Sequence, residues 1–199
     1  MSTGFDLDRI GGDKGLRALE DIVRRAGDTA LKHFRKGVVP EKKPDRSPVT
    51  IADRGAEEII RKHVISAHPE ASFLGEETGT HGDGRGIRFI VDPIDGTRAF
   101  VRGWPTWSVL LGVEAEGVPV VGIAYMPAAE DFFVAVQGDG ATHNGSPLQV
   151  SKIASLADAT VTHGGLQQFT MMKMAELLPK LAEASDIARG CPDFDGYRQ

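Results

Sequence analysis

Two stretches near the start of the chain carry hydrophobic residues at helical spacing. In the first, apolar side chains recur every three or four positions, charged side chains lie between them, and Gly37 follows directly. This pattern predicts an amphipathic helix over Gly15–Lys36 that ends at the glycine. Its predicted core-facing positions are Leu16, Leu19, Ile22, Val23, Ala26, Ala30 and Phe34.

A second helix is predicted to begin after Thr50. Threonine is a suitable N-cap, Asp53 lies three residues further on, and Pro69 ends the apolar pattern. Between the two helices, Val38–Pro48 is rich in proline and charge, so we expect an exposed loop there. The apolar face of the second helix is predicted to contain Ile51, Ala56, Ile59, Ile60 and Val64.

Beyond residue 70 the apolar residues occur in short runs rich in β-branched side chains, which is typical of strands. Gly and Asn pairs between these runs predict hairpin turns at Glu116-Gly117 and Asn144-Gly145, with a further turn at Gly138-Asp139-Gly140. The predicted strands are Ala71–Leu74, Ile87–Val91, Trp107–Ala115, Val118–Met126 and Phe132–Gln137, with a last short one near Leu148–Val150.

The order of two helices followed by a strand meander predicts an α/β protein of the layered α+β type. In such a fold, helices cover one face of a mostly antiparallel sheet. We expect residues 1–150 to form this helix pair and sheet, and residues 151–199 to begin a second α/β domain. The clearest helical segment there is Met171–Ala184, which Pro179 interrupts.

Composition and charge argue against a nucleic-acid-binding or membrane protein. The chain has 199 residues and a formal net charge of −5, so it offers no broad basic surface for nucleic acid or for an anionic membrane. Met1–Arg9 has no basic region followed by an apolar one, and no apolar run approaches the roughly 20 residues that span a bilayer. The single cysteine, Cys191, fits a reducing compartment. We therefore expect a cytoplasmic protein.

Asp92 directly follows the apolar run Arg88–Val91, and a second acid, Asp95, comes three residues later. Because Pro93 fixes its own φ and Gly96 permits a tight turn, the two carboxylates can come together. Their repulsion would raise a pKa unless a cation neutralised it, and Mg²⁺ prefers such oxygen ligands. The alternative is that both are ordinary turn and N-cap residues. An EF-hand and an Asp-x-Asp phosphatase are excluded because Ile94 occupies a position where either motif needs an acid.

A second acidic pair, Glu76 and Glu77, also follows an apolar run, Phe73–Gly75. If Glu76 and Asp92 end neighbouring strands, they can share one metal, and Glu77 would support them. The alternative for the glutamates is a solvated loop. Asp53 is a third candidate, although an acid in the first turn of a helix needs no catalytic role.

Thr97 lies two residues after Asp95, where the sequence predicts the start of a helix. Free backbone N–H groups of Gly96, Thr97 and Arg98 at such a start could hold a phosphate. A metal and an anion would then share one loop.

Together these residues resemble the inositol monophosphatase family of metal-dependent phosphatases. The signature elements of that family stand here as Gly75-Glu76-Glu77 and as Asp92-Pro-Ile-Asp-Gly-Thr97. The resemblance extends from Lys42–Asp53 through Gly138–Val150. It implies an α-β-α-β-α sandwich and Mg²⁺-dependent hydrolysis of a small phosphate monoester.

The resemblance also implies roles for individual residues. Glu76, Asp92 and the backbone carbonyl of Ile94 would bind one Mg²⁺, and Asp92 and Asp95 a second. Thr97 and Asp53 would orient a metal-activated water for in-line attack on phosphorus. The substrate site would be lined by Glu76, Ile94, Asp95, Gly96 and Thr97. Lys42 and Lys43 would lie near this site, although solvated lysines of a loop are the plainer interpretation.

One feature of the family is absent from these 199 residues. A later Trp-Asp motif supplies a ligand to the second metal, but Trp104 precedes Pro105 and Trp107 precedes Ser108. We therefore expect an incomplete second domain and a second metal site that lacks one ligand.

The substrate is left open between inositol monophosphate and histidinol phosphate, with a 3′-phosphonucleotide as a further possibility. A non-catalytic metal-binding or interaction module is the alternative from another class. The resemblance also implies a homodimer.

Overall fold

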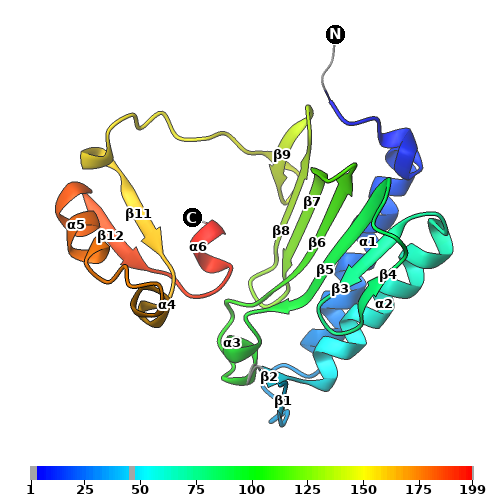
Figure 1. Ribbon diagram of the computed structural model, residues 1–199, viewed down its shortest axis with the longest axis horizontal. Coiled ribbons are helices and arrows are strands. Elements are labelled where there is room, and N and C mark those ends of the chain that lie inside the picture. Colours follow the sequence, from blue (N-terminus) through cyan, green and yellow to red (C-terminus); the bar gives the residue numbers. More distant parts are fainter. Residues whose placement is uncertain (1–3, 45–47, 199) are drawn as a thin grey trace. The chain divides into compact units, whose positions relative to one another are not determined.

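The computed structural model describes residues 4–44 and 48–198. The chain divides into two compact units, Met1–Leu148 (unit 1) and Gln149–Gln199 (unit 2), which are described separately. Unit 1 consists of a helix pair and a large sheet, whereas unit 2 consists of short helices and two strands (Figure 1). No helix in the part of the chain that the structure describes is long and apolar enough to cross a membrane.

Helix α1 spans Gly12–Leu31 and follows the short 3₁₀ helix η1, Leu7–Ile10. The predicted amphipathic pattern is confirmed, but the predicted end at Lys36 is wrong. After Leu31 the chain tightens, because the His33 N–H bonds the carbonyl of Ala30 at 2.9 Å and the next N–H repeats this three-residue spacing. The buried face of the helix contains Leu19, Ile22, Val23, Ala26 and Ala30.

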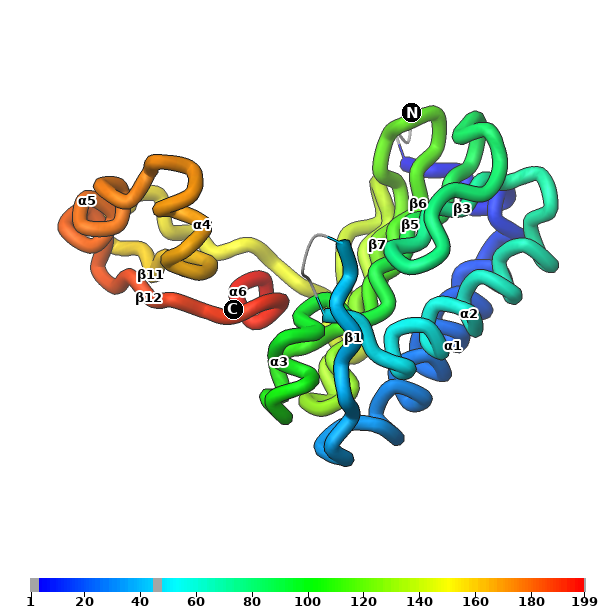
Figure 2. The backbone as a smooth tube through the Cα atoms, turned by 60° about the horizontal axis from the view of Figure 1, so that its bottom comes forward, coloured from blue at the N-terminus to red at the C-terminus, as the bar shows by residue number. Residues whose placement is uncertain are grey.

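Helix α2 spans Ile51–Ala67, and Thr50 is its N-cap as predicted. The Thr50 hydroxyl accepts a hydrogen bond from the N–H of Ala52 at 3.1 Å, and the Thr50 N–H donates to Asp53 Oδ2 at 2.8 Å. One predicted core position is wrong: Ile51 is 63% exposed, and Ala52 is buried instead. Helices α1 and α2 lie side by side (Figure 2).

The segment between the two helices contains more structure than the predicted loop. Strands β1, Glu41–Lys42, and β2, Pro48–Val49, pair antiparallel. Arg54 on α2 holds this pair through two hydrogen bonds to the Glu41 carboxylate, at 2.9 and 2.6 Å. Asp45, Arg46 and Ser47, which belong to the predicted loop and to the family-like segment, lie outside the described residues.

The main sheet has eight strands in the order β10-β9-β8-β7-β6-β5-β3-β4. All its neighbouring pairs are antiparallel except β3 and β5, so the predicted mostly antiparallel sheet is confirmed. The strands are β3 Ser72–Gly75, β4 Gly79–His81, β5 Ile87–Asp95, β6 Ser108–Ala115, β7 Val118–Met126, β8 Asp131–Val136, β9 Gly140–His143 and β10 Ser146–Pro147.

The end of the meander differs from the prediction. No strand covers Leu148–Val150; instead the short strands β9 and β10 meet at the predicted Asn144-Gly145 turn. Both turn residues have positive φ, 48° and 79°, as a tight hairpin of this type requires. Short strands rich in glycine and polar residues carry too weak an apolar pattern to be recognised, which also explains why β4 was missed.

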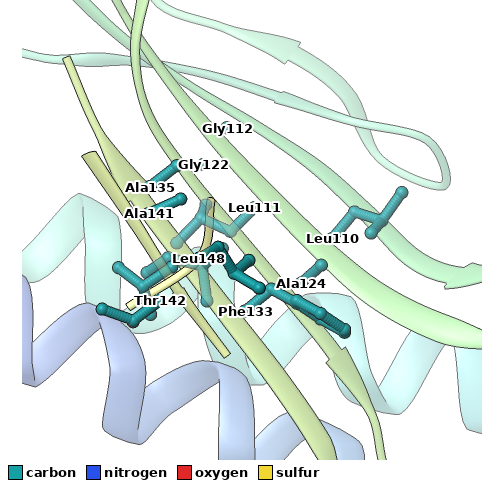
Figure 3. Close-up of a pocket in the computed structure, with 12 residues that line it drawn as sticks. Leu110, Leu111, Gly112, Gly122, Ala124, Phe133, Ala135, Ala141, Thr142 and Leu148 are labelled. Atoms are coloured by element: carbon teal, nitrogen blue, oxygen red, sulfur yellow. The ribbon is translucent and has the colours of Figure 1, made fainter. Parts of the chain in front are cut away.

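The two faces of the sheet differ. Alternate residues of β6, Val109, Leu111 and Val113, are buried in the core on the side of α1 and α2. Leu110 and Gly112, which lie between them, line an open apolar pocket on the sheet together with Leu111 (Figure 3). Its labelled lining includes Leu110, Gly112, Gly122, Ala124, Phe133 and Ala135.

Unit 2 contains a parallel pair of strands, β11 Thr160–His163 and β12 Ile187–Gly190. The predicted helix Met171–Ala184 is wrong at its start. This region forms two separate helices, α4 ending at Met171 and α5 beginning at Leu177, and Lys173 between them has φ of 58°. Pro179 is the third residue of the second helix, where a missing N–H costs nothing. The helices are η2 Leu156–Asp158, α4 Leu166–Met171, α5 Leu177–Ala184 and α6 Asp195–Arg198.

Candidate functional site

The parallel pairing of β3 and β5 brings two predicted site residues to one edge. Gly75 pairs with Val91, so Glu76 and Asp92 each directly follow one member of this pair. The backbone N–H of Glu76 donates to the carbonyl of Val91 at 3.1 Å. The expectation that these two acids end neighbouring strands is therefore met for Glu76, while β5 continues past Asp92.

The predicted end of this strand at Val91 is wrong, because β5 continues to Asp95. Asp92 pairs with Leu110, the register then shifts, and pairing resumes between Asp95 and Ser108. Pro93 lies inside this irregularity, where its missing N–H breaks the ladder without leaving a donor unpaired. Ser108 donates a long hydrogen bond of 3.4 Å to Asp95 Oδ2. The register shift therefore falls between the two aspartates, and Asp95 still acts on the pKa of Asp92.

The loop after β5 turns into the short helix α3, Thr97–Val101. Gly96 has φ of 84°, a left-handed conformation that favours glycine, and it begins the helix as the sequence predicted. The Thr97 hydroxyl lies 3.1 Å from Asp53 Oδ1 and 3.1 Å from the carbonyl oxygen of Ile94. This hydroxyl therefore connects α2 to the acidic loop.

Asp53 is completely buried and bonded on both carboxylate oxygens. Oδ2 accepts from the N–H and the hydroxyl of Thr50, and Oδ1 accepts from Thr97. Burial raises the pKa of Asp53 above its ordinary value, and the hydrogen bonds from Thr50 and Thr97 oppose this rise. Asp53 is thus both the helix-cap residue of the plainer interpretation and a partner of the candidate site.

The surroundings of Asp92 raise its pKa far above the ordinary value of an aspartate. Burial, the nearby Glu76 carboxylate and the Asp95 carboxylate raise the pKa of Asp92 to about 8. Its Oδ1 atom is buried and has no hydrogen-bond partner among residues 4–44 and 48–198. An unpaired carboxylate oxygen in such a place is unfavourable unless a cation joins it.

Lys43 supplies a cation to the edge of this cluster. Its Nζ lies 2.6 Å from Glu76 Oε1 and 2.6 Å from Glu77 Oε1. Burial lowers the pKa of Lys43, but its ion pairs with Glu76 and Glu77 outweigh burial and raise that pKa above its ordinary value. The expectation of a solvated lysine is wrong here, because the Lys43 side chain is only 17% exposed.

The donors at this edge suit a hard divalent cation. They comprise the carboxylates of Glu76, Asp92 and Asp95 and the carbonyl oxygen of Ile94, and oxygen donors are what Mg²⁺ prefers. Over the described part of the chain, no three His, Cys, Asp or Glu side chains are already arranged around one point as a metal cage. The Glu76 carboxylate pairs with the Lys43 ammonium and also acts on the pKa of Asp92.

Glu57, which the sequence pattern did not single out, is completely buried on α2. Its carboxylate accepts hydrogen bonds from the backbone N–H groups of Glu77 and Thr78, each at 2.8 Å. The available signal was its spacing of four residues from Asp53, which places both acids on one helix face.

Comparison with known proteins agrees with the geometry. A histidinol-phosphatase of Chlorobaculum parvum is 42% identical over 89% of this chain and 69% of its own length. Inositol monophosphatase 1 of Solanum lycopersicum is 34% identical over 68% of this chain and 51% of its own length. The crystal structure of the extragenic suppressor protein suhB from Bartonella henselae matches with a TM-score of 0.81 and 28% identity, over 92% of this chain and 71% of that one.

The chain thus spans from about half to about seven tenths of the length of these relatives. The two enzymes named above are phosphatases. The predicted α/β fold is confirmed by the structural match. Because the family model also matches residues 13–180, the chain belongs to the inositol monophosphatase family.

Proposed function

We propose that this protein hydrolyses a small phosphate monoester with the help of Mg²⁺, and that histidinol phosphate is its first candidate substrate. The observation that carries the proposal is the buried Oδ1 of Asp92, which lies beside other carboxylates and has no hydrogen-bond partner within the described residues. The substrate is ranked by the 42% identity to a histidinol-phosphatase, against 34% to an inositol monophosphatase.

Glu76, Asp92, Asp95 and the Ile94 carbonyl would hold the cation. When bound, Mg²⁺ would supply Lewis-acid chemistry, which neutralises phosphate charge and lowers the pKa of the attacking water. Asp92 is the central residue of this set, since the carboxylates of both Glu76 and Asp95 act on its pKa. Backbone N–H groups of Gly96 and Thr97 are proposed to bind the phosphate, as the family resemblance implies.

Thr97 and Asp53 are proposed to orient the attacking water. A hydroxyl has one hydrogen, so when Thr97 donates to Asp53 Oδ1 its oxygen lone pairs are free to accept a hydrogen from water. The raised pKa of Asp53 favours its acting as the final proton acceptor in this relay. The water oxygen bonds to phosphorus as the ester P–O bond breaks, one water proton passes through Thr97 to Asp53, and the leaving alkoxide takes up a proton from solvent.

The test is phosphate release by the purified protein from histidinol phosphate, inositol 1-phosphate and adenosine 3′,5′-bisphosphate, with and without Mg²⁺. Asp92→Asn should lower release at least about a hundredfold, because even partners of metal ligands cost 10–100-fold when mutated. Asp139→Asn, in the exposed turn between β8 and β9, is the matched control and should retain activity.

Three outcomes decide the proposal. Mg²⁺-dependent release that vanishes in Asp92→Asn supports it, and the preferred ester names the substrate. Release that survives in Asp92→Asn contradicts the proposed ligand set. A folded wild-type protein that binds Mg²⁺ and releases no phosphate would favour the non-catalytic module.

A further inference from the structure

Helix α2 carries a second buried carboxylate that the proposed chemistry does not use. Glu57 is completely buried, one helical turn beyond Asp53. Its Oε2 accepts from the N–H of Glu77 and its Oε1 from the N–H of Thr78, both at 2.8 Å. A buried carboxylate is costly unless it is hydrogen-bonded, so both oxygens are committed to this turn.

Gly75 makes the close approach of Glu57 possible. A Cβ placed on Gly75 would lie 2.4 Å from Glu57 Oε1, which is closer than real Cβ contacts. Only glycine therefore allows the end of β3 to pass directly over this carboxylate. Glycine is therefore needed at the start of the Gly75-Glu76-Glu77 element because the backbone there packs against Glu57, which lies 18 residues earlier on α2.

The turn after β3 is consequently held from two sides. Strand β5 holds it through the 3.1 Å bond from the Glu76 N–H to the Val91 carbonyl. Helix α2 holds it through Glu57. The same helix holds the loop after β5 through Asp53 and Thr97. Residues four apart lie on one face of a helix, so a single rigid element sets the spacing of both acidic loops.

We propose that Glu57 is a positioning residue of the candidate metal site. It anchors the backbone of Glu77 and Thr78 and thereby keeps the Glu76 carboxylate beside Asp92, where both can bind one divalent cation. This inference rests on the proposed Mg²⁺-dependent function and extends it to a residue that touches neither metal nor substrate.

The main test compares Glu57→Gln with Glu58→Gln. Glutamine keeps the size of the side chain but places an NH₂ group against one backbone N–H, so one of the two bonds is lost. Glu58 is the matched control, because it lies on the same helix and pairs with Arg61 and Lys62 at the surface. Titration with Mg²⁺ alone, by calorimetry, should show affinity about 10–100-fold weaker in Glu57→Gln and unchanged in Glu58→Gln.

Two further readouts separate positioning from general stability. Amide hydrogen exchange at Glu77 and Thr78 should become faster in Glu57→Gln while exchange in the core of α1 stays slow. In phosphate release, the Mg²⁺ concentration for half-maximal rate should rise, and excess Mg²⁺ should restore kcat close to the wild-type value. A purely structural role would lower protein stability without this rescue.

Gly75→Ala gives an independent variant if Glu57→Gln does not fold. This variant keeps the Glu57 carboxylate, but the added methyl group pushes it away from the turn, so Mg²⁺ affinity should again fall. In a Glu57→Ala background the added methyl group fits the vacated space, so Gly75→Ala should cost little more there. Such non-additivity is expected for residues in direct contact.

The outcomes distinguish this inference from the proposed function. Wild-type protein that binds no Mg²⁺ and releases no phosphate would overturn both. Wild-type protein that binds Mg²⁺ while Glu57→Gln and Gly75→Ala bind it equally well would overturn the positioning role alone. Weaker binding in both variants, with non-additivity in the double variant, would support it.

Discussion

Units 1 and 2 both contain helices and strands, but only unit 1 encloses a core. Trp107, Phe73, Phe89 and Phe100 are each no more than 2% exposed in unit 1. Among the described residues of unit 2, only Ser185 is buried, while Met171 and Tyr197 are more than 80% exposed. A unit of about 50 residues buries a small share of its surface, so this difference is expected from size.

The candidate site lies in the unit that encloses a core. Every candidate site residue, from Asp53 to Thr97, belongs to unit 1, where the sheet and α2 keep the carboxylates at close range. Burial is also the largest cause of the raised pKa values of Asp53 and Asp92. A surface like that of unit 2 would leave such acids solvated and their pKa values near the ordinary range.

The largest expected difference between the units is in the cost of a core deletion. Leu19→Ala on α1 should lower the free energy of unfolding by about 2–5 kcal/mol, because Leu19 is fully buried. Leu177→Ala on α5 should cost about 1 kcal/mol or less, since Leu177 is 36% exposed. Urea unfolding followed by far-ultraviolet circular dichroism measures both. Equal losses would show that unit 2 has a core of comparable strength.

A helix cap should give the next largest difference. Thr50→Ala removes a buried cap of the 17-residue helix α2 and should cost about 1 kcal/mol of stability. Ser155→Ala removes an exposed cap of the three-residue helix η2, and we expect a loss of about 0.5 kcal/mol or less. Thermal unfolding of the two variants beside the wild type checks the comparison. A larger loss for Ser155→Ala would contradict it.

The smallest expected effect is a pH dependence built into unit 1. Burial, and the nearby His63, lower the pKa of His68, which stacks on Phe89 with ring centroids 5.0 Å apart. The unfolded chain then binds more protons than the folded one, so stability should fall as pH drops through the unfolded pKa of about 6.5. Above that pH this contribution to stability is fully present.

His68→Phe tests the sign of this effect. It keeps a ring against Phe89 but removes the titrating group, so the melting temperature should fall less between pH 7.5 and pH 5.5 than in the wild type. An unchanged slope would remove His68 as a source of the pH dependence.

Local features of unit 1 were predictable from the sequence. The Thr50 cap and the turn at Glu116-Gly117, with φ of 52° and 79°, depend on a few neighbouring residues. The interruption of β5 between Asp92 and Asp95 was not foreseen, because it becomes visible only when Leu110 and Ser108 on the neighbouring strand define the register. Pairing partners of this kind are set by contacts far apart in the chain.

By itself, the sequence determined the two amphipathic helices, the antiparallel meander and the two acidic elements that identify the family. Only the tertiary structure decided the roles of Lys43 and Glu57, which bind residues at least 20 positions away. It also decided the raised pKa of Asp92, which depends on its burial and on its distance from Glu76. The reason is physical: hydrophobic periodicity and capping act within a few residues, whereas electrostatic interactions depend on which segments the fold brings together.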